Sequence, residues 1–326
     1  MAILIVASHQ AGAGKTSVAA GLGTLISRTG TAVSVCKPLS SIGRADPDAV
    51  YFAANFRGGV AVTSAEDNAG LDAAASAVRS LAGISEHIVV EVPTAAGDPG
   101  IASSTTQGLA ERLSARVAAV FGYDATLSAV SISSSIATLG DRLAGVIVNQ
   151  VPRYRTQQVH DILAEVAAAA VPVIAALPED RPMLSLTVTQ LAQELDGRWE
   201  LEPADTDEWI DRFLIGGNIM DSGAGYFGRY SHQAVITRAE RPDIQMASLM
   251  QDTRCLVLTG GSRPTEYIRV EARKRAVPVL LVDQGTVAAA DAVGGLLDVA
   301  VPHQPHKAER MADLLAERID IVGLVS

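Results

Sequence analysis

The stretch that decides the fold is residues 3–16, which read ILIVASHQAGAGKT. Its first five residues form a continuous apolar run, which is typical of a strand buried on both faces of a sheet. The segment AGAGKT follows, and residues 17–27 then have helical character. A strand, a glycine-rich turn that ends in Gly-Lys-Thr and a helix together form the context of a phosphate-binding loop (P-loop).

The residue types in this loop suit a polyphosphate. Small residues allow backbone N–H groups to approach phosphate oxygens closely, and the following helix presents its positive end to the anion. Lys15 is expected to reach the β- and γ-phosphates, and the Thr16 hydroxyl to bind Mg²⁺. The residues predicted to bind the nucleotide are Gly12, Ala13, Gly14, Lys15, Thr16 and Ser17.

One position departs from the motif G-x-x-x-x-G-K-[ST], because its first glycine falls on His9. A side chain at this position either changes the backbone geometry that the loop requires or contacts the ligand itself. The alternative to a working loop is a glycine-rich turn with an exposed lysine. The combination of Gly12, Gly14, Lys15 and Thr16 after the first strand favours nucleotide binding.

Short apolar runs alternate with helical patterns through the first half of the chain. Further strand candidates are residues 32–36, 87–92, 116–121, 143–149 and 171–175, with helices such as 157–169 between them. Such alternation predicts a parallel sheet with helices on both faces and right-handed crossovers. We therefore expect the α/β fold of a P-loop NTPase over residues 1–200, closed by a helix at 183–195.

A second, smaller α/β domain is predicted over residues 208–326. The segment 197–208 is acidic and loses its apolar period, so we place the boundary there. The expected strands are 233–237, 254–259 and 278–282, and the expected helices are 243–250, 264–275 and 287–297. Residues 215–228 are rich in glycine and are expected to form a loop.

Polar residues follow the predicted strands of the first domain at the edge where α/β sheets bind ligands. Glu91 and Asp48 are candidate Mg²⁺ ligands together with Thr16, and Asp46 lies beside them. Lys37 follows the second strand, and Asn149 ends the fifth. Ordinary alternatives stay open for these positions: helix N-capping, a surface lysine, a turn residue and a solvated strand end.

Composition bounds the class of protein. The chain has 326 residues, enough for two domains, and 48% of them are hydrophobic. Its net charge of −10 disfavours a nucleic-acid partner, because phosphate backbones need clustered Lys and Arg. Cys36 and Cys255 lie in apolar runs and are expected to be buried rather than paired. No signal peptide or membrane span is indicated, so we expect a cytoplasmic protein.

Taken together, the site residues resemble the dethiobiotin synthetase family. The Gly-Lys-Thr loop, Lys37-Pro38, Asp48, Glu91 and Asn149 occur in that family's order. The resemblance implies that the loop binds ATP, that Lys15 and Lys37 are catalytic, and that acidic residues hold magnesium. It implies further that Lys37 helps to bind the substrate and phosphate. It also implies that Asn149 helps to bind adenine. The loop at 92–97 lacks the glycine run that follows the matching Glu in true dethiobiotin synthetases.

The whole chain is similar to the N-terminal region of long phosphotransacetylases, in which a dethiobiotin synthetase-like domain precedes a DRTGG domain. The catalytic phosphotransacetylase domain has no counterpart here. The segments that carry the likeness are Leu177-Pro178-Glu179-Asp180-Arg181, Ile215-Gly216-Gly217, Val235-Ile236-Thr237, Arg241-Pro242-Asp243-Ile244-Gln245, Leu258-Thr259-Gly260-Gly261, Val277-Pro278-Val279 and Thr286. The resemblance implies a regulatory or dimerising second domain, which in some relatives binds adenine nucleotides.

Three functions follow from these observations. The first is a regulatory or sensor protein that binds ATP and Mg²⁺, with a small-molecule effector at the DRTGG domain and a homodimeric assembly. The second is an ATP-dependent synthetase or ligase that acts on a small carboxylate or amine. The third is a non-catalytic scaffold whose P-loop has decayed, for which His9 is the motivation. Whether the protein is an enzyme stays open at this point.

Overall fold

The computed structural model describes residues 2–40, 42, 45–64, 67–94, 101, 103–217, 223–296 and 300–325. Contacts divide the chain into a first unit, Met1–Asp180 with Pro302–Ser326, and a second unit, Arg181–Val301. The second unit therefore begins earlier and ends earlier in the chain than the expected domain 208–326. Residues 181–200 pack within the second unit, and the C-terminal residues return to the first unit after the chain has passed through the second.

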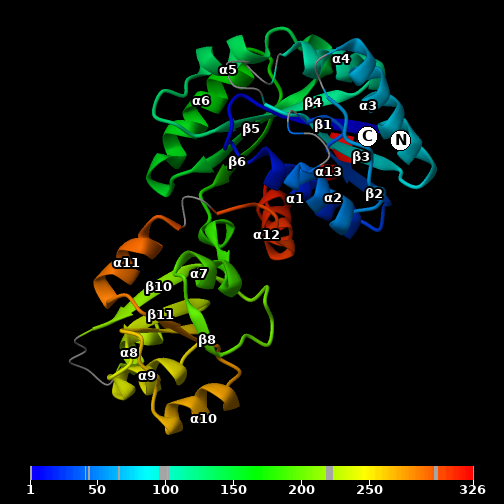
Figure 1. Ribbon diagram of the computed structural model, residues 1–326. Coiled ribbons are helices and arrows are strands. Elements are labelled where there is room, and N and C mark those ends of the chain that lie inside the picture. Colours follow the sequence, from blue (N-terminus) through cyan, green and yellow to red (C-terminus); the bar gives the residue numbers. More distant parts are fainter. Residues whose placement is uncertain are drawn as a thin grey trace. The chain divides into compact units, whose positions relative to one another are not determined.

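The first unit is built on a six-stranded sheet with the order β2-β3-β1-β4-β5-β6 (Figure 1). Every neighbouring pair is parallel, as the alternating pattern predicted. The strands are β1 (Ala2–Ser8), β2 (Val33–Cys36), β3 (His87–Glu91), β4 (Arg116–Gly122), β5 (Leu143–Val151) and β6 (Val173–Pro178). The fold is that of a P-loop NTPase, and β1 lies inside its sheet between β3 and β4.

Helices cover both faces of this sheet (Figure 1). They are α1 (Lys15–Arg28), α2 (Pro47–Asn55), α3 (Asn68–Ser80), α4 (Ser104–Leu113), α5 (Ala129–Ile136), α6 (Thr156–Ala168), α12 (Pro305–Ala316) and α13 (Ile321–Val325). Short 3-10 turns are η2 (Leu81–Gly83), η4 (Gly140–Arg142) and η5 (Arg153–Arg155). Buried residues of α3 to α6 form one core with the sheet, and α1, α2 and α12 lie on the opposite face.

Small residues bring α1 and α12 close together. α1 is rich in Ala and Gly, and most of its residues are buried. A Cβ atom at Gly21 would overlap with the Met311 side chain and come within 3.1 Å of Leu315. Only a residue without a side chain therefore allows α12 to pack at this distance. α12 is thus part of the first unit's core, a feature that the sequence pattern did not predict.

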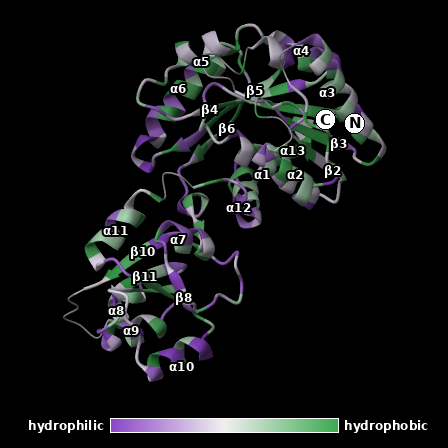
Figure 2. Cartoon of the chain, viewed as in Figure 1, coloured by the Kyte–Doolittle hydropathy of each residue, from purple (hydrophilic) through white to green (hydrophobic). Residues whose placement is uncertain are grey.

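The second unit has a five-stranded sheet with the order β10-β11-β12-β13-β8, in which only the β13–β8 pair is antiparallel. Its strands are β8 (Arg198–Leu201), β10 (Arg212–Gly216), β11 (Gln233–Arg238), β12 (Thr253–Thr259) and β13 (Val279–Val282), and β7 (Leu186–Thr187) pairs separately with β9 (Trp209–Ile210). The helices are η6 (Arg181–Leu184), α7 (Val188–Glu194), α8 (Ala224–Phe227), α9 (Pro242–Leu249), α10 (Glu266–Lys274) and α11 (Thr286–Gly294). Both faces of this sheet carry buried apolar clusters, and Figure 2 shows hydrophobic residues in its inner strand β11.

Two local expectations differ from the structure. The helix expected at 183–195 begins only at Val188, because Thr187 and Gln190 form a capping box after the short strand β7. The glycine-rich loop expected at 215–228 begins with the last residues of β10 and includes α8, while residues 218–222 lie outside the described residues. Residues 95–97, in the loop after Glu91, lie outside them too.

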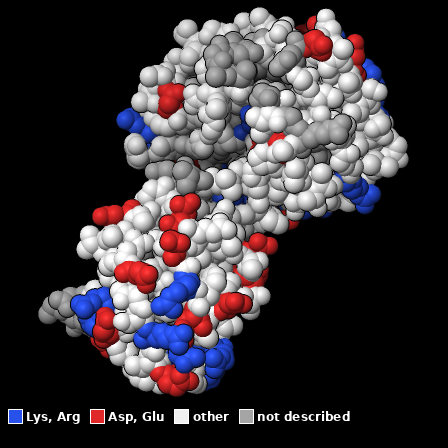
Figure 3. Space-filling model, viewed as in Figure 1, with Lys and Arg blue, Asp and Glu red and all other residues white. Residues whose placement is uncertain are grey.

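Cys36 and Cys255 are buried and unpaired, as expected. Among the described residues, no helix is both long and apolar enough to cross a membrane. On the face of the second unit that Figure 3 shows, basic and acidic side chains lie close together. Ion pairs of this unit include Arg254–Glu208 and Arg269–Glu266. Such largely exposed pairs contribute only about 0–1 kcal/mol each to stability.

Candidate phosphate-binding site

The predicted phosphate loop connects β1 to α1. Gly12 and Gly14 adopt φ values of +76° and +80°, a left-handed conformation that side chains disfavour. Gly14 is the N-cap of α1 and provides no side-chain cap to the helix. The first N–H groups of α1 are therefore available to an anion, and the helix dipole favours negative charge at the same place.

Two amide side chains hold the loop from behind. The Nδ2 atom of Asn149 donates to the carbonyl of Ala13 at 3.0 Å, and Nε2 of Gln150 donates to the carbonyl of Gly12 at 3.1 Å. Gln150 has a φ of +61°, which is uncommon for a residue with a side chain. Because both loop carbonyls accept from these amides, the strained end of β5 fixes the orientation of the peptide groups in the loop.

The His9 side chain packs against neighbouring residues of the sheet and α5. Its ring stacks on Phe121 with 5.7 Å between ring centroids, and Nδ1 lies 3.3 Å from the Ser135 hydroxyl. His9 is not among the described residues with positive φ. A histidine therefore fits the first position of the motif without backbone strain.

Glu91, Lys15 and Lys37 come together beside the loop. Glu91 ends β3 and is completely buried, and its Oε1 lies 3.7 Å from Nζ of both Lys15 and Lys37. The Thr16 hydroxyl donates to the same oxygen at 3.2 Å. The other carboxylate oxygen, Oε2, is buried and has no hydrogen-bond partner in the described structure. Such an orphaned oxygen costs free energy unless a ligand satisfies it.

Lys37 binds a second group of carboxylates on its other side. Its Nζ lies 3.0 Å from Oδ2 of Asp46 and 2.5 Å from Oδ2 of Asp48. Asp46 is also the N-cap of α2 and accepts from the backbone of Asp48 and Ala49. The N-cap interpretation of Asp46 is therefore confirmed, and its role in a ligand site stays a prediction. The remaining oxygen of Asp48, Oδ1, lies 2.7 Å from Nε2 of His303.

Burial and charge set the protonation of these groups. Burial, helped by the nearby charge of Asp48, outweighs the attraction of the two lysines and raises the pKa of Glu91 to about 7. Burial works in the same direction at Asp48. There the hydrogen bonds from His303 and Lys37 outweigh it and hold the pKa of the carboxyl well below its usual range. Despite desolvation, Glu91 and Asp48 raise the pKa of Lys37, so its ammonium is charged at neutral pH.

The donor set suits a magnesium ion that is shared with a nucleotide. Mg²⁺ in P-loop sites takes a hydroxyl, one or two carboxylates, phosphate oxygens and water. Thr16 and the unpartnered Oε2 of Glu91 supply the first two kinds of ligand. Both oxygens of Asp48 already have donors, so it fits this role less well than Glu91. Within the described part of the chain, no three His, Cys, Asp or Glu side chains gather as a self-sufficient metal site.

The predicted site residues form one connected group with the phosphate loop, in which Lys37, directly after β2, joins Asp48 to Glu91. Sequence reasoning missed Gln150 and His303. Gln150 directly follows a predicted site residue and ends an apolar strand, so its position was a usable signal. His303 carried no such signal, because only the return of the C-terminal segment brings it to the first unit.

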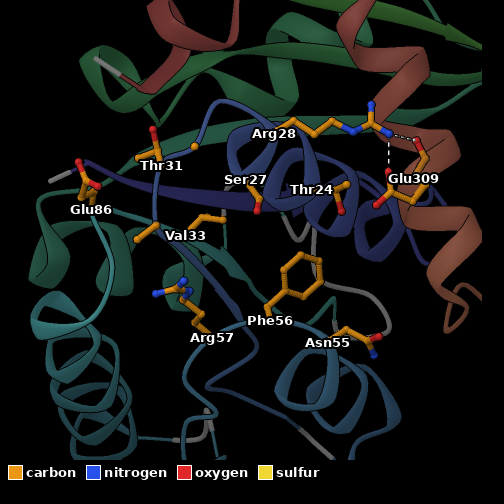
Figure 4. Close-up of a pocket in the computed structure, with 12 residues that line it drawn as sticks. Thr24, Ser27, Arg28, Thr31, Val33, Asn55, Phe56, Arg57, Glu86 and Glu309 are labelled. Atoms are coloured by element: carbon orange, nitrogen blue, oxygen red, sulfur yellow. Dashed lines mark hydrogen bonds and ion pairs between the residues drawn. The ribbon is translucent and has the colours of Figure 1, made fainter.

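A separate pocket of about 650 Å³ lies at the other end of α1, next to the start of β2 (Figure 4). Arg28, Arg57, Phe56 and Glu309 are among its lining residues. Arg28 binds Glu309 of α12 and donates to Asp313 at 2.8 Å. The length of α1 separates this pocket from Lys15, so it does not belong to the phosphate loop.

In the second unit, Gly260 and Gly261 follow Thr259 at the end of β12, and glycines at such a place form either an anion-binding nest or a tight left-handed turn. The two glycines have φ values of +90° and +70°, and their N–H groups donate to the carbonyls of Gln284 and Val282. The amides are therefore already used, which favours the turn. Nearby in the sequence, Arg241 forms a bidentate ion pair with Asp243, with donor–acceptor distances of 3.0 and 2.8 Å.

Residues 4–186 match the family described as CobQ/CobB/MinD/ParA nucleotide binding domain, and residues 190–296 match the DRTGG domain. The chain is also similar to the CBS and DRTGG domains of the regulatory region of Clostridium perfringens pyrophosphatase, which was solved with its activator diadenosine tetraphosphate. That pair is 14% identical with a TM-score of 0.31, and the match covers 35% of this chain and 50% of that one, so this chain spans half of it.

Two further solved structures are similar to the first unit. The MinC:MinD cell division protein complex of Aquifex aeolicus is 16% identical over 56% of this chain and 84% of that chain, with a TM-score of 0.41. Cobyrinic acid a,c-diamide synthase from Mycobacterium smegmatis, with bound ATP analog and magnesium, is 17% identical over 55% and 88%, with a TM-score of 0.40. Likeness at this level assigns no ligand to this chain.

The family match covers more than half of the chain and includes the whole phosphate loop. It is broader than the expected resemblance to dethiobiotin synthetases and long phosphotransacetylases, which stays a prediction. The observed sheet order, the loop geometry and the two matches agree on one assignment. The chain belongs to the CobQ/CobB/MinD/ParA nucleotide-binding domain family and carries a DRTGG domain after that domain.

Proposed function

We propose that this protein binds ATP and Mg²⁺ in its first unit and acts as a nucleotide-responsive regulatory protein. The observation that carries the proposal is the group formed by Lys15, Lys37 and Glu91 beside an uncapped helix N-terminus. Two ammonium groups and a set of free N–H groups at one point suit a triphosphate. The buried, unpartnered oxygen of Glu91 suits the accompanying cation.

Each residue has a defined task in this proposal. The N–H groups of the loop bind phosphate oxygens, and Lys15 neutralises charge on the β- and γ-phosphates. Thr16 and Glu91 hold Mg²⁺, while Asp48, the third ligand expected from the sequence, holds Lys37 and His303 instead. The ion, when bound, neutralises the developing charge on the phosphates. Lys37 adds a second positive charge on the γ-phosphate side, a role that the resemblance to dethiobiotin synthetases implies.

The regulatory part of the proposal is supported by the path of the chain. The polypeptide leaves the first unit after Asp180 and returns to it at Pro302. The residue after Pro302 is His303, which contacts Asp48. A ligand that binds the DRTGG domain acts on a segment with two covalent connections to the nucleotide-binding unit. The resemblance of this domain to regulatory modules makes an adenine nucleotide the first effector to test, and a homodimer the assembly to expect.

Isothermal titration of the full chain with ATP and Mg²⁺ tests the proposal. We expect saturable binding by the wild type and at least a tenfold loss of affinity in Lys15→Ala, because a charged hydrogen bond to phosphate is removed. Lys274→Ala, at an exposed lysine of the second unit, is the matched control and is expected to bind like the wild type. Wild-type protein that takes up no ATP, or equal binding by Lys15→Ala, contradicts the proposal.

A second candidate is an ATP-dependent synthetase for a small carboxylate or amine. The observation in its favour is that Lys37, the counterpart of a substrate-binding lysine in dethiobiotin synthetases, lies 3.7 Å from Glu91 of the phosphate site. Phosphate release that rises above background with one substrate of a carboxylate and amine panel, and falls in Lys37→Ala, would favour this function over regulation.

The third candidate, a scaffold with a decayed loop, gains no support from its only motivation. The His9 ring packs on Phe121 and leaves the conformation of Gly12 and Gly14 intact. The titration with ATP and Mg²⁺ separates this candidate from the other two, since it alone expects no binding.

A further inference from the structure

The C-terminal segment that follows the second unit is built into the first unit. α12 packs on α1 at Gly21, and its Arg310 forms a bidentate ion pair with Asp180 at 3.0 and 2.6 Å. At the start of the segment, the Tyr51 hydroxyl donates to the carbonyl of Gln304 at 3.4 Å. The segment is therefore held at both ends, and its first residues are fixed next to α2.

His303 is held on two sides by residues of α2. Its Nε2 lies 2.7 Å from Oδ1 of Asp48, and its ring lies 5.5 Å from the ring of Tyr51, centroid to centroid. The His303 and Asp48 side chains are 21% and 19% exposed, so solvent screens this contact only in part. Because two contacts already restrain this imidazole, it loses less rotamer entropy on binding Asp48 than an exposed surface side chain would lose.

The two oxygens of Asp48 have different partners. Oδ1 is bound to His303, while Oδ2 is bound to Lys37 at 2.5 Å. His303 thus fixes the rotation of the carboxylate, and the carboxylate fixes the Lys37 ammonium, which Asp46 holds from a second direction at 3.0 Å. This ammonium lies 3.7 Å from Glu91, which in turn accepts from Thr16 of the phosphate loop.

An unbroken series of polar contacts therefore connects the C-terminal segment with the phosphate loop. We propose that His303 is a positioning residue of the nucleotide site, which orients Lys37 toward the terminal phosphate by holding Asp48. The inference rests on the proposed function, because it assigns a task to a residue next to the same site. His303 itself does not touch the nucleotide; it acts through Asp48 and Lys37.

A double-mutant cycle on the full chain tests this role. The affinity for ATP with Mg²⁺ is measured by calorimetry in the wild type, His303→Ala, Lys37→Ala and the double variant. We expect each single variant to lose about tenfold in affinity, and the double variant to lose no more than Lys37→Ala alone, because both changes remove one contact series. Losses that multiply in the double variant, or a His303→Ala protein with wild-type affinity, overturn the inference.

Two further variants separate positioning from a general effect on folding. His303→Gln retains a side-chain N–H donor for Asp48, so it is expected to recover most of the lost affinity. His160→Ala, at an exposed histidine of α6, is the matched control and is expected to bind as the wild type does. A lower urea midpoint in His303→Ala together with no recovery in His303→Gln indicates a structural role and overturns the inference.

The terminal phosphate provides a second readout. Since Lys37 is assigned to that phosphate, His303→Ala is expected to weaken ATP about tenfold while changing ADP affinity less than twofold. Equal losses for ATP and ADP overturn the inference while leaving the proposed function standing. Wild-type protein that binds neither nucleotide overturns the proposed function, and the inference with it.

Discussion

The imidazole Nε2 of His303 lies 2.7 Å from Oδ1 of Asp48, although 255 positions separate the two residues in the chain. This contact ties the segment after the DRTGG domain to the carboxylates around Lys37. It makes residues 302–325 part of the nucleotide-binding unit rather than an appendage of the second unit. That unit is therefore assembled from residues near both ends of the given sequence.

Substitution of Asn149 distinguishes a role in supporting the phosphate loop from a role in binding the adenine base. Its amide donates to the Ala13 carbonyl, so Asn149→Ala is expected to weaken ATP and GTP by the same factor of about five, the cost of one hydrogen bond. Calorimetry with both nucleotides checks this. A loss confined to ATP would show instead that Asn149 binds adenine, as the resemblance to dethiobiotin synthetases implies. Gln150→Ala removes the other amide that supports the loop and is likewise expected to weaken both nucleotides equally.

A substitution at Gly21 tests the packing of α12 on α1. In Gly21→Ala, the new methyl group overlaps with Met311, so the free energy of unfolding is expected to fall by about 1–2 kcal/mol. The greater helix propensity of Ala, worth up to about 1 kcal/mol, acts in the opposite direction, so a net loss is informative. Urea denaturation provides the measurement. Gly83→Ala, where no atom lies within 4 Å of the new Cβ, is expected to change stability by less than about 0.5 kcal/mol.

The ion pairs of Arg28 are expected to matter less than this packing. Arg28 binds Glu309 and Asp313 of α12, but these three side chains are 38%, 60% and 49% exposed. Water and salt screen such pairs, so Arg28→Ala is expected to cost no more than about 1 kcal/mol of unfolding free energy. A larger loss than in Gly21→Ala, measured in the same urea series, would mean that charge rather than packing holds α12.

Glu91 predicts a pH dependence of stability in the nucleotide-free protein. Its folded-state pKa of about 7 lies above the ordinary value of 4.5, so the folded state binds more protons between these pH values. The stabilisation is complete below pH 4.5 and is lost as pH rises through 7. As pH rises from 4.5 through 7, the unfolding free energy of Glu91→Gln is therefore expected to increase relative to that of the wild type, by on the order of 3 kcal/mol.

Urea titrations at several pH values between 4.5 and 8 check this difference. Glu86→Gln, at an exposed residue near the start of the same strand, is the matched control and is expected to run parallel to the wild type. Parallel curves for Glu91→Gln and the wild type would show that the lysines compensate the buried charge completely.

Local pattern was sufficient for the first sheet and the phosphate loop. The strands β1, β3 and β4 are continuous apolar runs because parallel strands are buried on both faces, and the turn at Gly12 to Thr16 carries its own chemistry. The carboxyl ends of parallel strands share one edge, so Lys37 and Glu91 were expected to meet Lys15. The structure brings these three side chains together.

The remaining features depend on contacts that leave no local trace. The strand β8 lies at the edge of its sheet and needs apolar residues on only one face. The sequence pattern of the acidic segment 197–208 therefore did not reveal it. The start of α7 is set by Thr187, whose capping role depends on the β7–β9 pair. The contact of His303 with Asp48 depends on the return of the chain from the second unit, and no short-range pattern encodes such a return.

A crystal structure of the full chain, soaked with Mg²⁺ and a non-hydrolysable ATP analogue, tests the central claim most directly. We expect electron density for the β- and γ-phosphates within hydrogen-bond distance of the N–H groups of residues 12–17 and of Lys15 Nζ, with the metal on Thr16 and Glu91. Phosphates bound elsewhere in the chain, or a phosphate loop that stays empty at saturating analogue, would contradict the account.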